Sequence, residues 1–215
     1  MLEEDRARIR TFLIADIRGY SSFTEKEGDE AAARLASRFA GLAREIVSRN
    51  GGEVIELRGD EALAVFDSAR QALTAAVRLQ ERFADETVID PRLPLRVGMG
   101  LDTGEAVPVD GGFRGKAINV AARLCSLAAP GEVLATQELA HVATRVEGIK
   151  LEDRGSATVK GMTEPVRVVK VLPEGGDPSA RLASAGQLGS TTTYDTPEVL
   201  PKSRRLLWRR RPPGG

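Results

Sequence analysis

Strand-like and helix-like patterns of apolar residues alternate along the first 172 residues of the chain. The mostly apolar run at 11–17 predicts a buried strand, and apolar residues three and four positions apart predict a helix over 29–49. Asn50 and the two glycines after it are typical of a helix end. The further elements expected are strands at 53–57 and 62–66 joined by a hairpin turn, a helix at 68–84, a strand at 94–101 paired with 105–109, a helix at 116–128, a strand at 132–135, a helix at 137–144, and strands near 149–152, 157–160 and 166–171.

The order of these elements predicts the fold class. A β-α-β-β-α-β succession followed by further strands and helices indicates an α/β (α+β) protein with a ferredoxin-like βαββαβ core and a largely antiparallel sheet. Residues 173–215 are instead rich in Pro, Gly, Ser and Thr and contain few large apolar side chains. Such a composition is typical of a disordered linker or tail. We therefore expect one folded domain over 1–172 and a disordered tail over 173–215.

Composition narrows the class of protein. Of the 215 residues, 41% are hydrophobic and 29% are charged, which favours a soluble globular protein over a fibrous or disordered one. The single cysteine cannot form an internal disulfide, so a cytoplasmic setting is expected. No apolar run approaches the roughly 20 residues that span a bilayer, and the charged N-terminus does not resemble a secretory signal.

The charge is balanced over the whole chain but not along it. Lys and Arg number 31 and Asp and Glu number 31, so the total gives no reason to expect nucleic acid as a partner. The tail carries a net +3 and the domain −3. Basic residues around Leu206, Leu207 and Trp208 could contact an anionic membrane surface weakly, at about 1 kcal/mol per Lys or Arg. They could equally form a solvated tail, and the domain could also belong to a larger, membrane-associated chain.

Two acidic residues are candidates for a metal site. Asp16 ends the first buried strand, and Asp60 lies in the hairpin turn. In the predicted topology the first strand lies beside the hairpin, so both carboxylates could converge at one edge of the sheet. Mg²⁺ prefers one or two carboxylates together with waters and substrate phosphates. Each Asp alone could equally be a turn former, and Glu61 is a weaker neighbour because it would face away from Asp60.

The segment after Asp16 is a short Gly- and Ser-containing loop that leads into a helix. It contains Gly19, Tyr20 and Ser21. Backbone N–H groups at a helix N-terminus can bind phosphate. The chain has no GxxxxGK[ST] motif, so this is not a Walker-type loop.

A third candidate lies in the predicted helix 116–128. Asn119 and Arg123 are four residues apart and share one helical face. Such a pair could hold a ribose and a phosphate, because the planar arginine group matches phosphate oxygens. It could also be an ordinary solvated face. Cys125 is expected to be a small core residue, and His141 has no partners for a metal or nucleophile site.

Five segments now point to a family. They are FLIADIRGYSSFTE, GGEVIELRGDEALAVF, LRVGMGLDTGEA, GKAINVAARL and DRGSATVKGMTEPVRVVKV. In this order and spacing the chain resembles, over roughly residues 9–172, the catalytic domain of class III nucleotidyl cyclases, the adenylate and guanylate cyclases. The resemblance implies conversion of ATP or GTP to the 3′,5′-cyclic monophosphate and pyrophosphate, in intracellular signalling.

The resemblance also implies roles for particular residues. Asp16 and Asp60 match the two aspartates that hold two Mg²⁺ or Mn²⁺ ions, with the backbone carbonyl of Ile17 as a further ligand. With the metals bound, the ribose 3′-hydroxyl attacks the α-phosphorus. Gly19, Tyr20 and Ser21 would contact the substrate.

The remaining implied groups lie later in the chain. Asn119 matches a ribose-orienting asparagine, Arg123 a transition-state arginine, and Lys160 a phosphate-binding lysine. Sites in the family form between two subunits. The partners expected are therefore a nucleoside triphosphate and a second copy of the chain in a homodimer.

Three positions depart from the usual pattern. Glu56 stands where many adenylate cyclases have lysine, and Glu there resembles guanylate cyclases, in which it can accept hydrogen bonds from guanine. Glu56 could instead be a solvent-facing strand residue. Gly112 offers no side chain at the second base-selecting position, and Asp102 stands where the family often has His. The choice of base therefore stays open, with GTP mildly favoured.

The sequence leaves two alternatives to an active cyclase. Glu56 and Gly112 are compatible with a catalytically weak regulatory module that binds nucleotide and dimerises. A diguanylate cyclase would be expected to carry a GG[DE]EF turn, which the residues around Asp60 do not match.

Overall fold

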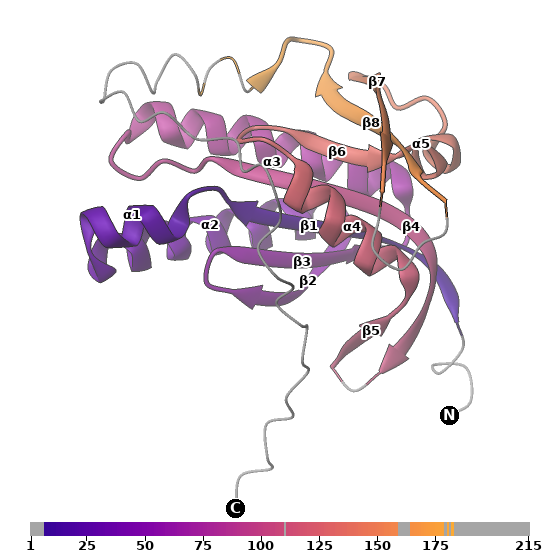
Figure 1. Cartoon of the computed structure of the whole chain (residues 1–215), viewed down its shortest axis with the longest axis horizontal. Coiled ribbons are helices and arrows are strands. Elements are labelled where there is room, and N and C mark those ends of the chain that lie inside the picture. The colour runs from indigo at the N-terminus through magenta and orange to yellow at the C-terminus, as the bar shows by residue number, and fades with distance from the viewer. Residues whose placement is uncertain (1–6, 110, 159–163, 179, 181, 183–215) are drawn as a thin grey trace, which may run out of the picture.

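The computed structural model describes residues 7–109, 111–158, 164–178, 180 and 182 (Figure 1). Helices and strands alternate much as the sequence pattern predicts. The elements are β1 (Arg8–Ile17), α1 (Tyr20–Glu27), α2 (Asp29–Arg49), β2 (Gly52–Arg58), β3 (Glu61–Phe66), α3 (Ala69–Ile89), β4 (Val97–Val109), β5 (Gly112–Arg114), α4 (Lys116–Leu127), β6 (Val133–Thr136), α5 (Gln137–Ala143), β7 (Ile149–Ala157) and β8 (Val166–Pro173).

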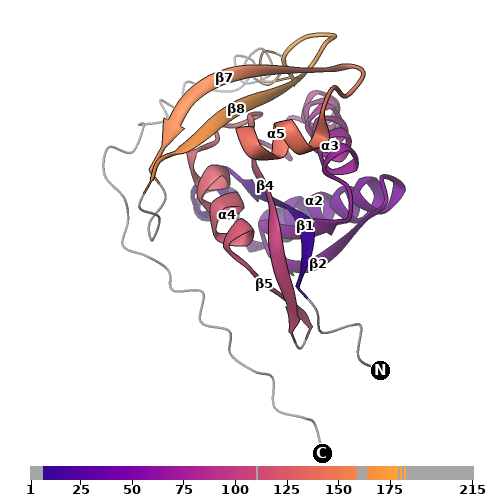
Figure 2. The ribbon, with the colours of Figure 1, turned by 90° about the vertical axis from the view of Figure 1, so that its right-hand side faces the viewer.

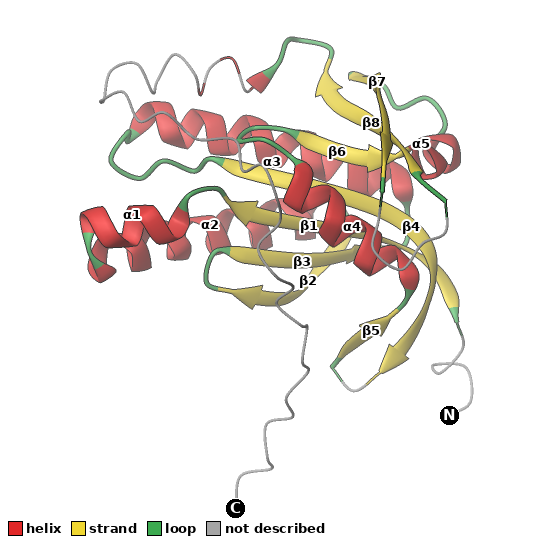
Figure 3. Ribbon diagram, in the orientation of Figure 1, coloured by secondary structure: helices red, strands yellow, loops and turns green. Residues whose placement is uncertain are grey.

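The described strands form one 8-stranded sheet (Figure 3). Its order is β2-β3-β1-β4-β6-β8-β7, with β5 paired to the far end of β4. Neighbouring strands run antiparallel except β4 and β6, which run parallel. The strand order β2-β3-β1-β4 with helices α2 and α3 is that of the predicted ferredoxin-like core. The fold class is thereby confirmed.

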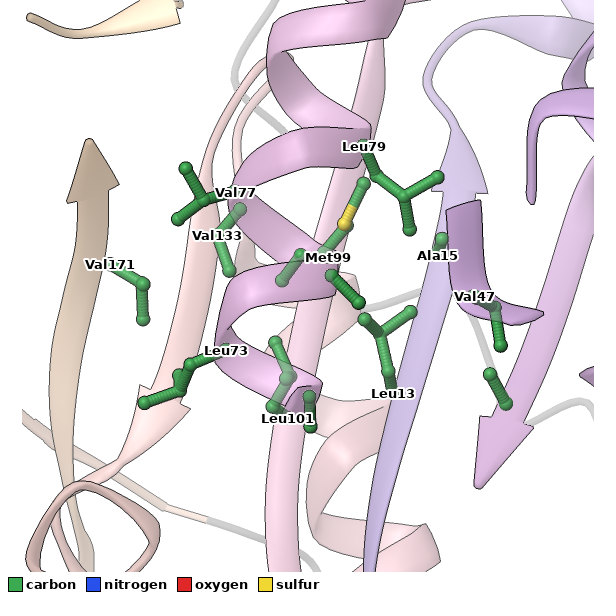
Figure 4. Close-up of a cluster of buried hydrophobic side chains, with 14 of the residues drawn as sticks. Leu13, Ala15, Val47, Leu73, Val77, Leu79, Met99, Leu101, Val133 and Val171 are labelled. Atoms are coloured by element: carbon green, nitrogen blue, oxygen red, sulfur yellow. The ribbon is translucent and has the colours of Figure 1, made fainter. Parts of the chain in front are cut away.

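Helices cover both faces of the sheet, as Figure 2 shows. Helices α2, α3 and α5 lie on one face and build the larger hydrophobic core with alternate residues of the central strands. Helix α4 lies on the other face and packs mainly on β1 and β4. Figure 4 shows part of the larger core, where side chains of α3 meet those of the strands, among them Leu13, Leu73, Val77, Leu79, Met99, Leu101, Val133 and Val171.

Two strand predictions are wrong. Residues 105–109 do not fold back on 94–101, because β4 is one continuous strand and its N-terminal ten residues pair with β1 from Val97 to Ala106. The long partner strand keeps the Thr-Gly segment at 103–104 extended, and the turn comes later, at Gly111. The strand expected near 149–152 does not end there, because it continues to Ala157 as one strand, β7, with a register shift after Asp153. Residues 159 and 160 of the strand expected near 157–160 lie outside the described residues.

Helix α4 approaches β4 very closely at Gly100. A β-carbon at this position would lie 2.1 Å from the carbonyl oxygen of Ala121 and 2.1 Å from the backbone nitrogen of Cys125. Both are backbone atoms of α4, so no side-chain rotation relieves the clash. Glycine at position 100 therefore sets the distance between α4 and the sheet.

Gly100→Ala is expected to lower the free energy of unfolding by about 1–3 kcal/mol, because it forces α4 away from a well-packed strand. Urea unfolding measures the change. The control is Gly104→Ala on the same strand, where the new β-carbon meets only the β-carbon of Ala117 at 3.4 Å. Equal stability of the two variants would contradict the close approach.

The chain continues to contact the domain after β8 ends at Pro173. Lys170 Nζ lies 2.6 Å from Asp177 Oδ2, and Leu182 is buried. Residues 183–215, with the basic cluster, lie outside the described residues, so the boundary at 173 and the role of the tail stay predictions. In the part of the chain that the structure describes, no helix has both the length and the hydropathy to cross a membrane.

Candidate active site

The topology brings Asp16 and Asp60 to the same end of the sheet. Asp16 lies near the end of β1 and pairs in register with Glu61, the first residue of β3. Asp60 precedes Glu61 in the β2–β3 turn, and its carbonyl oxygen accepts a hydrogen bond from the Ile17 backbone N–H at 3.0 Å. The two predicted metal ligands and Ile17 are thus adjacent because β3 pairs directly with β1.

Acidic and basic side chains lie together at this edge. Burial raises the pKa of Asp16 to about 6, Arg18 opposes this rise, and the nearby carboxylates of Asp60 and Glu61 add to it. Burial likewise raises the pKa of Glu61, Arg58 opposes this rise, and Glu56 and Asp60 add to it. A bound cation would reduce the electrostatic repulsion between these carboxylates, which raise one another's pKa.

The N-terminus of α1 lies directly after this edge. Gly19 adopts a left-handed conformation, with φ of 75°, that turns the chain from β1 into α1. Tyr20 and Ser21 are the first residues of the helix, and helix geometry leaves their N–H groups without intrahelical acceptors. The loop predicted to contact phosphate is therefore placed beside Asp16.

Glu56 lies on the same face of the sheet as Asp16. Its register partner on β3 is Leu63, which packs with α4-face residues of β1 such as Ile14. Its carboxylate forms an ion pair with Arg58 and is about one quarter exposed. The predicted base-selecting residue thus lies on β2, two strands from Asp16.

Asn119 and Arg123 lie on α4, away from the residues that pack on the sheet. Asn119 is exposed and Arg123 is half-buried. Among the described residues, the Arg123 Nε atom is buried without a hydrogen-bond partner. Cys125, on the opposite face of the helix, is 3% exposed in the core under α4, as expected.

The two groups of predicted site residues do not converge within one chain. Asp16 pairs in register with Gly98. The α4 backbone at Ala121 and Cys125 packs against Gly100, two residues further along β4, but Asn119 and Arg123 lie on the helix face turned away from the sheet. Gly112 pairs with Val109, and the length of β4 from Gly98 to Val109 is roughly 35 Å at about 3.3 Å per residue. Lys160 lies in 159–163, outside the described residues.

Asp102 is a buried acid between α4 and α5. It is 8% exposed, and its Oδ1 accepts a hydrogen bond from Thr136 Oγ1 at 2.6 Å. Thr136 also caps α5 by accepting from the Leu139 N–H. Burial raises the pKa of Asp102 to about 6, against the hydrogen bonds it accepts, while the charges of Glu138 and Lys116 have smaller opposing effects.

The free energy of unfolding of Asp102→Asn, measured relative to that of the wild type, is expected to be higher at pH 7 than at pH 4. The folded wild type keeps the Asp102 proton until about pH 6, whereas the unfolded chain releases it near the ordinary pKa of 3.8. The wild type therefore loses stability from this group as pH rises from about 4 to 6, and the asparagine variant does not. Urea unfolding at pH 4, 5, 6 and 7 measures the difference. An exposed control, Asp29→Asn, should show no such trend, and a constant difference for Asp102→Asn would contradict the assignment.

The donors at the Asp16 edge suit a hard divalent cation. Arg18 donates a hydrogen bond to Oδ2 of Asp16, and within the described residues Oδ1 accepts no hydrogen bond. Two carboxylates with one backbone carbonyl match the ligands that Mg²⁺ takes when waters and phosphates complete its shell. No cluster of three or more His, Cys, Asp or Glu side chains with metal-binding geometry is present in the described part of the chain.

Comparison with known proteins places the chain in a family. Residues 3–171 match the model of the adenylate and guanylate cyclase catalytic domain. The chain belongs to this family.

Similar proteins carry the same assignment. A Rhizobium meliloti (strain 1021) protein named "Putative adenylate cyclase 3" is 31% identical over 169 residues, which are 77% of this chain and 28% of that protein. The crystal structure of an adenylate/guanylate cyclase/hydrolase from Silicibacter pomeroyi superposes with a TM-score of 0.67 at 30% identity, over 79% of this chain and 99% of that one. The adenylyl cyclase CyaB from P. aeruginosa shares the fold, with a TM-score of 0.68 at 24% identity over 81% and 98%. The chain spans about 28–38% of the length of the first curated relatives that it matches.

The structure adds one residue to the site that the sequence pattern did not single out. Arg18 contacts the Asp16 carboxylate, with Nη1 2.5 Å from Oδ2. A signal was present, because residues two apart on an extended chain share a face. That pattern could not reveal the other contacts of Arg18, which come from α4.

Proposed function

We propose that the protein is a nucleotidyl cyclase that converts a purine nucleoside triphosphate, ATP or GTP, to the 3′,5′-cyclic monophosphate and pyrophosphate. The observation that carries this proposal is the placement of Asp16 and Asp60 at one edge of the sheet in a chain of the cyclase family. The α1 N-terminus beside them offers N–H groups for the phosphates.

Asp16, Asp60 and the Ile17 carbonyl would hold two Mg²⁺ or Mn²⁺ ions. When bound, such ions lower the pKa of the attacking 3′-hydroxyl and neutralise the charge on the phosphates. This charge matters because the surrounding edge is acidic and would otherwise repel a triphosphate. Asp16 keeps one carboxylate oxygen for this role while Arg18 holds the other.

The second half of the site would come from another copy of the chain. Asn119 and Arg123 lie on the face of α4 that is turned away from the sheet that carries Asp16. In a symmetric homodimer each chain would supply Asp16 and Asp60 to one site and the α4 pair to the other. This arrangement agrees with the interfacial sites of the family.

The α4 side chains have suitable chemistry for these roles. The Asn119 amide can donate to and accept from ribose oxygens, which orients the 3′-hydroxyl toward the α-phosphorus. The Arg123 guanidinium can bind two phosphate oxygens and stabilise charge that develops there. Among the described residues no group accepts a hydrogen bond from its Nε, so the guanidinium is not fully satisfied by its own chain. Lys160 is proposed as a further phosphate contact.

Glu56 favours guanine over adenine. A carboxylate can accept from guanine N1–H and N2–H, whereas adenine presents no N1–H donor. Glu56 lies on the same face of the sheet as Asp16, which supports this role, and its carboxylate pairs with Arg58. Gly112 supplies no side chain for a second base contact, so GTP is proposed as the preferred substrate with ATP as the other candidate.

The alternative function is a nucleotide-binding, dimerising module with little turnover, favoured by Gly112 at the base-selecting position. The test is to incubate the purified protein with Mg²⁺ or Mn²⁺ and ATP, GTP, CTP or UTP, and to identify products by mass spectrometry. A cyclic purine nucleotide supports the enzyme. Triphosphate binding without any cyclic product would support the alternative.

A further inference from the structure

Arg18 forms a junction between β1, β4 and α4. Its backbone N–H donates to the Arg96 carbonyl oxygen at 2.7 Å, which fixes the residue beside the start of β4. The guanidinium contacts the Asp16 carboxylate through Nη1 and the Ala128 carbonyl oxygen through Nε at 3.1 Å. The remaining nitrogen, Nη2, donates to the Cys125 carbonyl oxygen and lies 3.4 Å from its Sγ. All three nitrogens of the side chain are therefore engaged.

The neighbouring strand is shaped to admit this side chain. A β-carbon at Gly98 would lie 2.4 Å from Arg18 Nη2 and 2.5 Å from its Nε. Glycine at this position thus makes room for the guanidinium between β4 and α4. Lysine could not replace Arg18. A single ammonium group cannot reach one carboxylate and two separated carbonyl oxygens, as the planar guanidinium does.

The contacts to Cys125 and Ala128 cap the C-terminal end of α4. The last four carbonyl groups of a helix lack intrahelical partners, and a cation there also interacts favourably with the helix dipole. Arg18 supplies both effects to the helix that carries Asn119 and Arg123. The same guanidinium therefore contacts the carboxylate of Asp16, a proposed metal ligand, and the C-terminal end of α4, the helix that carries the proposed nucleotide-binding residues.

We propose that Arg18 is a positioning residue that ties the Asp16 carboxylate to the C-terminal end of α4. This inference rests on the proposed cyclase function. In the proposed homodimer, Asp16 and α4 of one chain serve different sites, so Arg18 fixes the geometry of both sites at once. A displacement of Asp16 at one site is then transmitted to Arg123 of the other through a single side chain.

The experiment uses a heterodimer with one active site. One protomer, the metal-side protomer, carries Arg123→Ala and supplies only Asp16 and Asp60. The other, the helix-side protomer, carries Asp60→Asn and supplies only Asn119 and Arg123. Arg18→Met, which removes the charge but keeps the aliphatic volume, is placed in one protomer at a time, with separate affinity tags to isolate the heterodimer.

The two placements are expected to give different kinetic signatures. In the metal-side protomer, Arg18→Met should raise the Mn²⁺ concentration for half-maximal activity by about 10-fold or more, as for other residues that orient a metal ligand. In the helix-side protomer it should lower kcat by about 10-fold with the Mn²⁺ requirement unchanged. An effect confined to one placement, or absent from both, overturns the proposal.

Two further variants separate positioning from general folding. Arg18→Lys keeps a positive charge beside Asp16. In the metal-side protomer it should therefore restore the wild-type Mn²⁺ requirement, but in the helix-side protomer it should not restore kcat. Recovery of both parameters would show that charge alone suffices and would overturn the proposal. Arg34→Met removes an exposed arginine that pairs with Glu30 on α2, and it should change neither parameter. Melting temperatures of all variants show whether the fold is kept.

A readout without catalysis distinguishes failure of this proposal from failure of the proposed function. Hydrogen exchange at the end of α4 should be faster in Arg18→Met than in the wild type, because the helix end loses its cap. Mn²⁺ alone should change exchange there in the wild type and not in Arg18→Met. Unchanged exchange overturns the proposal. A parent heterodimer that forms no cyclic product would instead count against the cyclase function.

Discussion

Asp60→Asn is expected to reduce cyclic-nucleotide formation by at least about 100-fold, because it removes one of two carboxylates that hold the metals. The variant should fold normally. The negative charge of Asp60 raises the pKa of both Asp16 and Glu61, so its removal relieves repulsion at a half-buried edge. The expected signature is therefore a large loss of activity with an unchanged or higher melting temperature.

Asp60 is a sharper test than Asp16. Asp16→Asn should also abolish turnover, but it would leave the guanidinium of Arg18 without its carboxylate partner and could weaken the fold. Initial rates with excess Mn²⁺ and a melting curve for each variant measure both effects. The control is Asp29→Asn, an exposed aspartate on α2. Activity of Asp60→Asn comparable to that control would contradict the metal assignment.

Mixing two inactive variants is expected to restore activity. A chain with Asp60→Asn retains Asn119 and Arg123, and a chain with Arg123→Ala retains Asp16 and Asp60. In a heterodimer one site contains all intact groups, whereas each homodimer has none. Random association of equal amounts should give about a quarter of the wild-type activity, since half of the dimers are mixed and each has one intact site of two.

The complementation assay depends on showing that heterodimers form. Tandem affinity purification through two different tags isolates them, and the purified heterodimer should approach half of the wild-type rate per dimer. A mixture of Asp16→Asn with Asp60→Asn is the control, because both changes affect the same half of the site. No activity in isolated heterodimers, with each parent correctly folded, would exclude a site shared between chains.

The juxtaposition of Asp16 and Asp60 could be predicted because it follows from topology alone. Once a βαββαβ order is inferred, the first strand lies beside the hairpin, and the end of one meets the turn of the other. The bounds of α2 also follow from the sequence, since apolar spacing ends at Asn50. Local pattern and tertiary structure agree at these points.

Other features depend on contacts that no local pattern shows. Helix α3 continues past the predicted end at 84 to Ile89, because Thr87 is buried and its hydroxyl donates to the Phe83 carbonyl oxygen and accepts from the Leu95 N–H. The continuity of β4 requires the length of β1 on the neighbouring strand. The role of Arg18 requires the end of α4, which is more than 100 residues away in the sequence.

Cyclisation of a nucleoside triphosphate yields two products, and measuring both in one reaction tests the proposed function. Purified wild-type protein is incubated with Mn²⁺ and GTP, or ATP, and pyrophosphate and 3′,5′-cyclic nucleotide are measured together over time. We expect equal amounts of the two, because attack of the 3′-hydroxyl on the α-phosphorus releases one pyrophosphate per ring closed. Pyrophosphate accompanied by linear monophosphate, or no product from either nucleotide, would contradict it.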